Sequence, residues 1–125
     1  MGTVKRLSVN ELKRITGISQ KQYKTVPWHT TTIVIKQMLS LSEYLTAVDS
    51  ILESCKSPEG EIAIELLDFA IRVGVISAYA FVELPEDIGE LYYLMYASDL
   101  YDLVCSVANS SQVESIKKTV DNIIE

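Results

Sequence analysis

The sequence is poor in the residues on which small active sites and disulfide frameworks are usually built. Its 125 residues include two cysteines, one histidine and five glycines. The chain has no CxxC or HExxH pattern, so the usual zinc-ligand spacings are absent. It also has no GxSxG elbow and no glycine-rich phosphate loop, which disfavours a serine hydrolase or a nucleotide-binding enzyme. We therefore expect no catalytic residues, no metal and no cofactor.

The few cysteine and histidine residues have ordinary structural explanations. Cys55 and Cys105 lie far apart, each on the apolar face of a predicted helix. We expect reduced core residues, with a single disulfide between them as the alternative. The histidine, His29, follows Trp28 at a predicted turn and has no partners at ligand spacing. A turn residue is the simpler interpretation.

Long apolar runs are also missing. Uncharged segments such as 25–35 and 73–82 stay near ten residues, whereas a membrane span needs about 20. No apolar stretch follows the basic N-terminus, so we expect no secretory signal. With 48% apolar and 22% charged residues, the composition is that of one globular domain over residues 1–125. We expect a cytosolic protein.

Charge is unevenly distributed along the chain. Residues 1–40 carry seven Lys or Arg and one acid, a balance of +6, and residues 41–125 carry four basic and sixteen acidic residues, a balance of −12. Three hypotheses follow: binding to nucleic acid, binding to an acidic protein, or head-to-tail association of the two ends. Nucleic acid is disfavoured, because the chain is acidic overall and has no recognisable nucleic-acid motif.

The first 40 residues predict a short helix and a hairpin. Ser8 and Glu11 form a capping box, and Gly17 suits a helix end, so we expect a helix over about 9–16. The segment from Thr25 to Lys36 is rich in β-branched residues. It predicts a hairpin over about 24–37 that turns near His29, with the better strand at 31–37.

The remaining residues, 41–125, predict a bundle of about five helices. A second capping box, at Ser40 and Glu43, precedes an apolar stripe that ends at a break at 57–60. We expect one long, central helix from Glu61 to about Ala80, in which Gly74 either allows close helix packing or simply costs stability. Two short helices (86–97 and 99–108) and a last helix capped by Ser111 and Glu114 follow. The predicted fold is mainly α with a small β-hairpin, in which the N-terminal helix and hairpin pack on the bundle.

Two regions have the composition of a protein interface. Tyrosines crowd residues 92–101 with a methionine among them, and both residue types are common at interfaces; the alternative is that they cover the core. A strand at 31–36 with an open edge invites pairing with another chain. The residues that we predict at an interface are Trp28, Ile33, Ile35, Tyr93 and Tyr96.

The order of short motifs along the chain is distinctive. The motifs are Trp28-His29, Ile33-Val34-Ile35-Lys36, Leu39-Ser40-Leu41, Asp68-Phe69-Ala70-Ile71, Tyr79-Ala80, Leu84-Pro85-x-Asp87 and Tyr93-x-x-Tyr96-x-x-Asp99. Over about residues 5–125, this order resembles the small tail assembly chaperones encoded in tail modules of phages and prophages of Gram-positive bacteria. The shared motifs are hydrophobic and structural, and they match no residue known to contact a client.

The resemblance implies a non-catalytic protein that binds the tape measure protein and recruits tail tube subunits during assembly. It also implies self-association and absence from the finished particle. Two other functions stay open on the sequence: a structural head–tail connector or tail completion protein, and a small regulatory or anti-defence protein.

Overall fold

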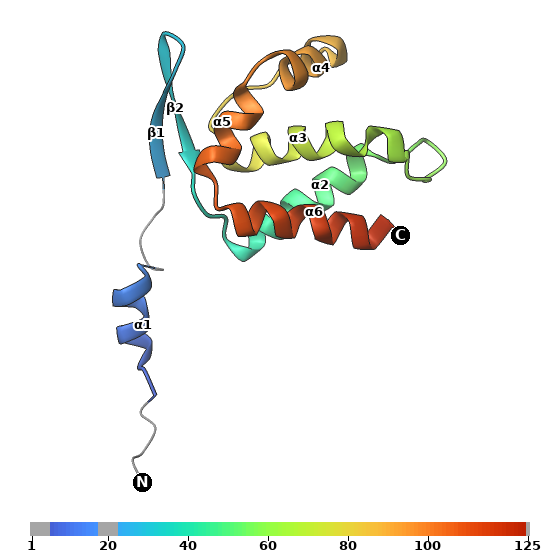
Figure 1. Cartoon of the computed structure of the whole chain (residues 1–125). Coiled ribbons are helices and arrows are strands. Elements are labelled where there is room, and N and C mark those ends of the chain that lie inside the picture. The colour runs from blue at the N-terminus through green and yellow to red at the C-terminus, as the bar shows by residue number, and fades with distance from the viewer. Residues whose placement is uncertain (1–5, 18–22, 125) are drawn as a thin grey trace.

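The computed structural model describes residues 6–17 and 23–124. In this part the chain forms six helices and one two-stranded antiparallel hairpin (Figure 1), which confirms the predicted fold class. The elements are α1 (Val9–Thr16), β1 (Tyr23–Trp28), β2 (Thr31–Lys36), α2 (Leu41–Ser54), the short 3-10 helix η1 (Ile64–Leu66), α3 (Leu67–Tyr79), α4 (Ile88–Ala97), α5 (Leu100–Val107) and α6 (Ser110–Ile124).

Helix α3 is the centre of the bundle. It packs against α2, α4 and α5, and its side chains Val75, Ile76 and Tyr79 are fully buried. Gly74 allows the close approach of α2, because a Cβ atom at this position would lie 2.4 Å from Cγ1 of Ile51. Of the two explanations for Gly74, the structure therefore supports close packing.

The hairpin is attached to the bundle by one face and one edge. Val26 lies opposite Ile33 in the register, and these two side chains and Ile35 face the core. At the edge of β2, Ile35 forms a bridge with Ala80, and the amide of Phe81 donates to the carbonyl of Val34 over 3.0 Å. Because the helices cover this face, a hairpin that would be marginal alone is stabilised.

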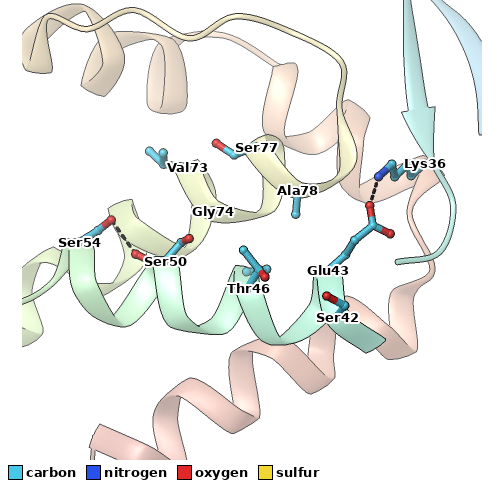
Figure 2. Close-up of a pocket in the computed structure, with 11 residues that line it drawn as sticks. Lys36, Ser42, Glu43, Thr46, Ser50, Ser54, Val73, Gly74, Ser77 and Ala78 are labelled. Carbon is cyan, nitrogen blue, oxygen red and sulfur yellow. Dashed lines mark hydrogen bonds and ion pairs between the residues drawn. The ribbon is translucent and has the colours of Figure 1, made fainter. Parts of the chain in front are cut away.

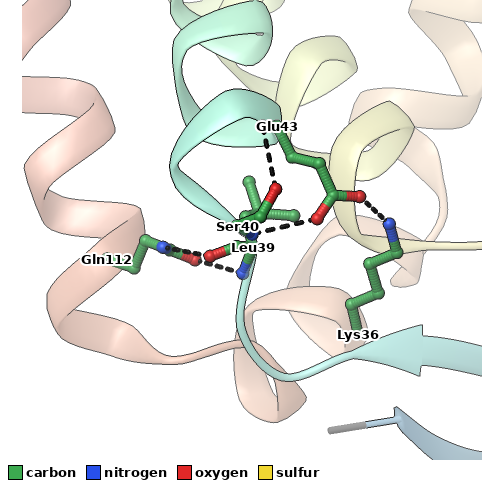
Figure 3. A network of polar contacts seen from close by, with 5 residues as sticks. All are labelled: Lys36, Leu39, Ser40, Glu43 and Gln112. Atoms are coloured by element: carbon green, nitrogen blue, oxygen red, sulfur yellow. Dashed lines mark hydrogen bonds and ion pairs between the residues drawn. The ribbon is translucent and has the colours of Figure 1, made fainter. Parts of the chain in front are cut away.

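A network of polar contacts joins β2, α2 and α6 (Figure 3). The side chain of Gln112 accepts from the amide of Leu39 over 2.8 Å and donates to its carbonyl over 3.2 Å. Glu43 accepts from the amide of Ser40, which completes the capping box of α2, and also from Lys36. The path of the chain into α2 is therefore fixed by side chains from three elements.

Two predicted helix starts are wrong. The central helix begins at Leu67 and not at Glu61, because Ile62 pairs with Lys56 and the amide of Ala63 donates to the carbonyl of Cys55. The last helix begins at Ser110. Its cap is Asn109, whose side-chain oxygen accepts from the amide of Gln112 over 2.9 Å, and not Ser111.

Helix α1 forms where predicted but does not pack on the bundle as predicted. It has its complete capping box at Ser8 and ends at Gly17 with φ 66°, yet none of its residues is buried. Figure 1 shows it beyond the base of the hairpin, away from the other helices.

Candidate protein-binding surface

The five predicted interface residues separate into two groups. Ile33 and Ile35 are 5% and 0% exposed, so the structure corrects their assignment: both belong to the core, on the face of the hairpin that the helices cover. Tyr93 is 73% exposed and Tyr96 is 40% exposed. Trp28 is half-buried at the tip of the hairpin.

Trp28 holds the tip of the hairpin on the junction between α4 and α5. Its indole Nε1 donates to Oδ1 of Asp99 over 2.8 Å, and this hydrogen bond lowers the pKa of Asp99 below its usual value. The neighbouring His29 has a φ of 54°, which suits the first position of a type II′ hairpin turn. Trp28 therefore has a structural partner within its own chain.

The exposed side of α4, together with α3, forms an aromatic surface, which we define as Phe69, Ile88, Tyr92, Tyr93 and Tyr96. The rings of Tyr92 and Tyr96 lie 4.8 Å apart, and Phe69 lies 5.5 Å from Tyr92 and 6.5 Å from Tyr96. Ile88 is largely exposed beside them. Such tilted contacts between rings contribute stability beyond simple burial, so the three rings form one packed unit.

A polar cluster fixes the orientation of Tyr96. Its hydroxyl donates to Oδ2 of Asp68 over 2.5 Å, and Nε of Arg72 donates to the same oxygen over 3.0 Å. The Arg72 guanidinium lies 4.5 Å from the ring of Tyr96 and 4.7 Å from that of Tyr101. The hydrogen bond from Tyr96 lowers the pKa of Asp68, and partial burial with this hydrogen bond raises the pKa of Tyr96 to about 12. At neutral pH Asp68 therefore stays ionised as the acceptor, and Tyr96 keeps the hydroxyl proton that it donates.

Four of the five residues of the aromatic surface belong to α4, which lies in a part of the chain that carries only negative charge. Residues 73–116 contain no Lys or Arg and seven acids, among them Glu86, Asp87 and Glu90 at the start of α4. The nearest cation along the chain, Arg72, is paired with Asp68. A partner for this surface would therefore present apolar side chains together with basic ones.

A groove lies between α2 and α3 (Figure 2). This groove has a volume of about 450 Å³. It is lined by Lys36, Ser42, Glu43, Thr46, Ala47, Ser50, Ser54, Val73, Gly74, Ser77 and Ala78. Its only charged lining residues, Lys36 and Glu43, pair with each other at one end. The groove therefore offers small hydroxyl groups but no free charge to bind or activate a ligand.

Within residues 6–17 and 23–124, no three His, Cys, Asp or Glu side chains gather as a metal site would require. The same residues contain no helix long and apolar enough to cross a membrane. Comparison of the chain with protein-family models, with curated proteins and with solved structures found no match.

The sequence does not reveal the side chains that hold Tyr96 and Trp28 in place. Asp68 and Arg72 stand four residues apart and could have been recognised as a helical ion pair. However, Asp68 is 28 residues from Tyr96, and Asp99 is 71 residues from Trp28. No local pattern indicates such distant contacts.

Proposed function

We propose that this protein is a phage tail assembly chaperone that works in the cytoplasm of the bacterial host. It binds the tape measure protein and brings tail tube subunits to it, without any chemistry of its own. The order of motifs suggests this client, and the structure offers a surface on which a client can bind.

The aromatic surface is the observation that carries the proposal. Aromatic side chains on a folded domain provide a large contact area at a small entropy cost, and they dominate binding energy at many interfaces. Here the rings of Phe69, Tyr92 and Tyr96 are held in place by mutual packing and by Asp68. A rigid, acidic, aromatic surface on α4 suits a helical client with apolar and basic residues on one face.

The test is co-expression with the large, helix-rich protein encoded directly downstream, followed by affinity capture of this chain. We expect a soluble complex, whereas the large protein alone is insoluble. The double variant Ile88→Ser and Tyr93→Ser should lower recovery at least about tenfold, which is the effect of losing one or two interface anchors. Both side chains are exposed, so the variant should fold normally by circular dichroism.

The matched control is Leu45→Ser, which removes an exposed apolar side chain from α2, outside the aromatic surface. It should leave recovery unchanged. Absence of any complex with the unaltered chain, combined with detection of this chain in purified particles by mass spectrometry, would contradict the proposal. That result would favour a structural connector or tail completion protein.

A further inference from the structure

Two aspartates occupy the same position in neighbouring helices but use their side chains differently. Asp87 is the N-cap of α4, and its Oδ1 accepts from the amide of Glu90 over 2.9 Å. Asp99 is the N-cap of α5, yet its side chain makes no capping hydrogen bond. Oδ1 of Asp99 accepts instead from the indole Nε1 of Trp28 over 2.8 Å. The tip of the hairpin therefore binds a carboxylate that would otherwise cap α5.

The amides that Asp99 would cap belong to its own helix. A side chain at the N-cap ordinarily accepts from the second or third amide of its helix, here that of Tyr101 or Asp102. The bond to Trp28 and such a cap are both single hydrogen bonds to an exposed carboxylate. They are therefore of similar strength, and the two arrangements of Asp99 are close in free energy.

Capping of α5 would also change the angle between α4 and α5. N-cap residues ordinarily have an extended backbone, and Asp87 follows this rule with φ −67° and ψ 123°. Asp99 departs from it, with φ −94° and ψ 12°. Only Ser98 and Asp99 separate the two helices. Rotation about ψ of Asp99 into the extended region would therefore swing α4 relative to α5.

Helix α4 is the helix of the bundle with the fewest buried side chains. It buries Met95 alone, whereas α2, α3, α5 and α6 each bury three or more. Its further contacts with α3 include the hydrogen bond from Tyr96 to Asp68 and the ring contact with Phe69. A helix with so little buried surface moves more easily than its neighbours, and α4 carries most of the aromatic surface.

We propose that Trp28 and Asp99 form a latch that holds α4 in the position in which the aromatic surface is packed. When the latch opens, Asp99 caps α5 and α4 leaves this position. The tip of the hairpin and α4 lie at the same end of the molecule (Figure 1), so a change at the tip reaches the aromatic surface. Trp28 and Asp99 are therefore positioning residues for client binding, a role that rests on the function proposed above.

The first test uses Trp28 as its own reporter, because it is the only tryptophan in the chain. Asp99→Ser keeps a residue that caps a helix, but its shorter side chain does not reach the indole. We expect its tryptophan emission to move to longer wavelength and quenching by acrylamide to increase. Asp87→Ser makes the same change at the start of α4 and should alter neither. Emission and quenching in Asp99→Ser equal to those of the unaltered chain would overturn the proposal.

Amide hydrogen exchange measures whether the latch positions α4. Trp28→Phe keeps an aromatic ring at the tip of the hairpin but removes the indole donor. Exchange across residues 88–97 should become at least about threefold faster. Exchange of the amides of Tyr101 and Asp102 should slow, because Asp99 is released to cap them. In Asp99→Ala, which has neither latch nor cap, both segments should exchange faster. Unchanged exchange in α4, or no slowing at the start of α5 in Trp28→Phe, would overturn the proposal.

Capture of the client separates the latch from the function proposed above. Trp28→Phe and Asp99→Ser should each lower recovery of the large, helix-rich protein at least about threefold, with circular dichroism as the check on folding. Asp121→Ser, which removes an exposed charge from α6, should leave recovery unchanged. Full recovery with both latch variants would overturn the role in client binding. Absence of a complex with the unaltered chain would contradict the proposed function, while emission and exchange would still decide whether the latch exists.

Discussion

Helices α1 and α2 begin in the same way and end in different environments. Each starts with a serine cap and a glutamate three residues later, and in each the two reciprocal hydrogen bonds are formed. Yet α2 buries Ala47, Val48 and Ile51, whereas α1 buries nothing. The comparison shows that a capping box and an apolar stripe determine where a helix forms, and that the presence of a neighbouring surface determines whether it is buried.

The largest difference in stability between the two helices is expected when one isoleucine in each is replaced by alanine. Ile51→Ala in α2 should lower the free energy of unfolding by about 2–5 kcal/mol, because the side chain is fully buried against Gly74 and leaves a cavity. Ile15→Ala in α1 should change it by less than about 0.5 kcal/mol, because the side chain is exposed. Urea unfolding measures both changes, at a protein concentration low enough that copies of the chain do not associate. A large loss from Ile15→Ala under these conditions would show that α1 packs on its own bundle.

Local patterns predicted the elements well, because their causes lie within a few residues. The capping boxes at Ser8 and Ser40 gave the starts of α1 and α2 to the residue. The β-branched run gave β2 to within one residue. The start of α3 was missed, because it depends on the pairing of Ile62 and Ala63 with the end of α2 and on the 3-10 helix η1 that follows.

Predictions that depend on the third dimension were less successful. Sequence shows that Ile33 and Ile35 share one face of a strand, but not that helices cover that face. It also indicates that the tyrosines are crowded, but not that Tyr96 is held by Asp68. Packing between distant segments decided both outcomes, and no single-sequence pattern records such packing.

Removal of each serine cap should change stability less than the isoleucine substitution does. The effect should again be larger in α2 than in α1. Ser40→Ala should cost about 0.5–2 kcal/mol of unfolding free energy, because the amide of Glu43 loses its acceptor at the start of a packed helix. Ser8→Ala should leave the unfolding midpoint unchanged, since the bundle does not depend on α1. Instead it should speed amide exchange across residues 9–16, read by hydrogen–deuterium exchange. Equal shifts of the midpoint in the two variants would contradict the contrast.

The smallest expected effect is the pH dependence of stability that comes from Glu43 of α2. The hydrogen bond from Lys36, followed by that from the amide of Ser40, lowers the pKa of Glu43. A carboxylate whose pKa is lower in the folded state stabilises the fold above its unfolded value of about 4.3, and this contribution is lost as the pH falls through the folded pKa.

Glu43→Gln removes the charge but keeps a residue that a capping box accepts. At neutral pH it should cost at most about 1 kcal/mol, because the pair is partly exposed and screened by solvent. The difference from the unaltered chain should begin to shrink as the pH falls to about 4.3 and disappear once the pH is below the lowered pKa of Glu43, measured as urea midpoints across this range. Glu11→Gln in α1 is the matched change and should leave the midpoint unaltered at every pH. If the two variants behave alike, the ion pair with Lys36 does not distinguish α2 from α1.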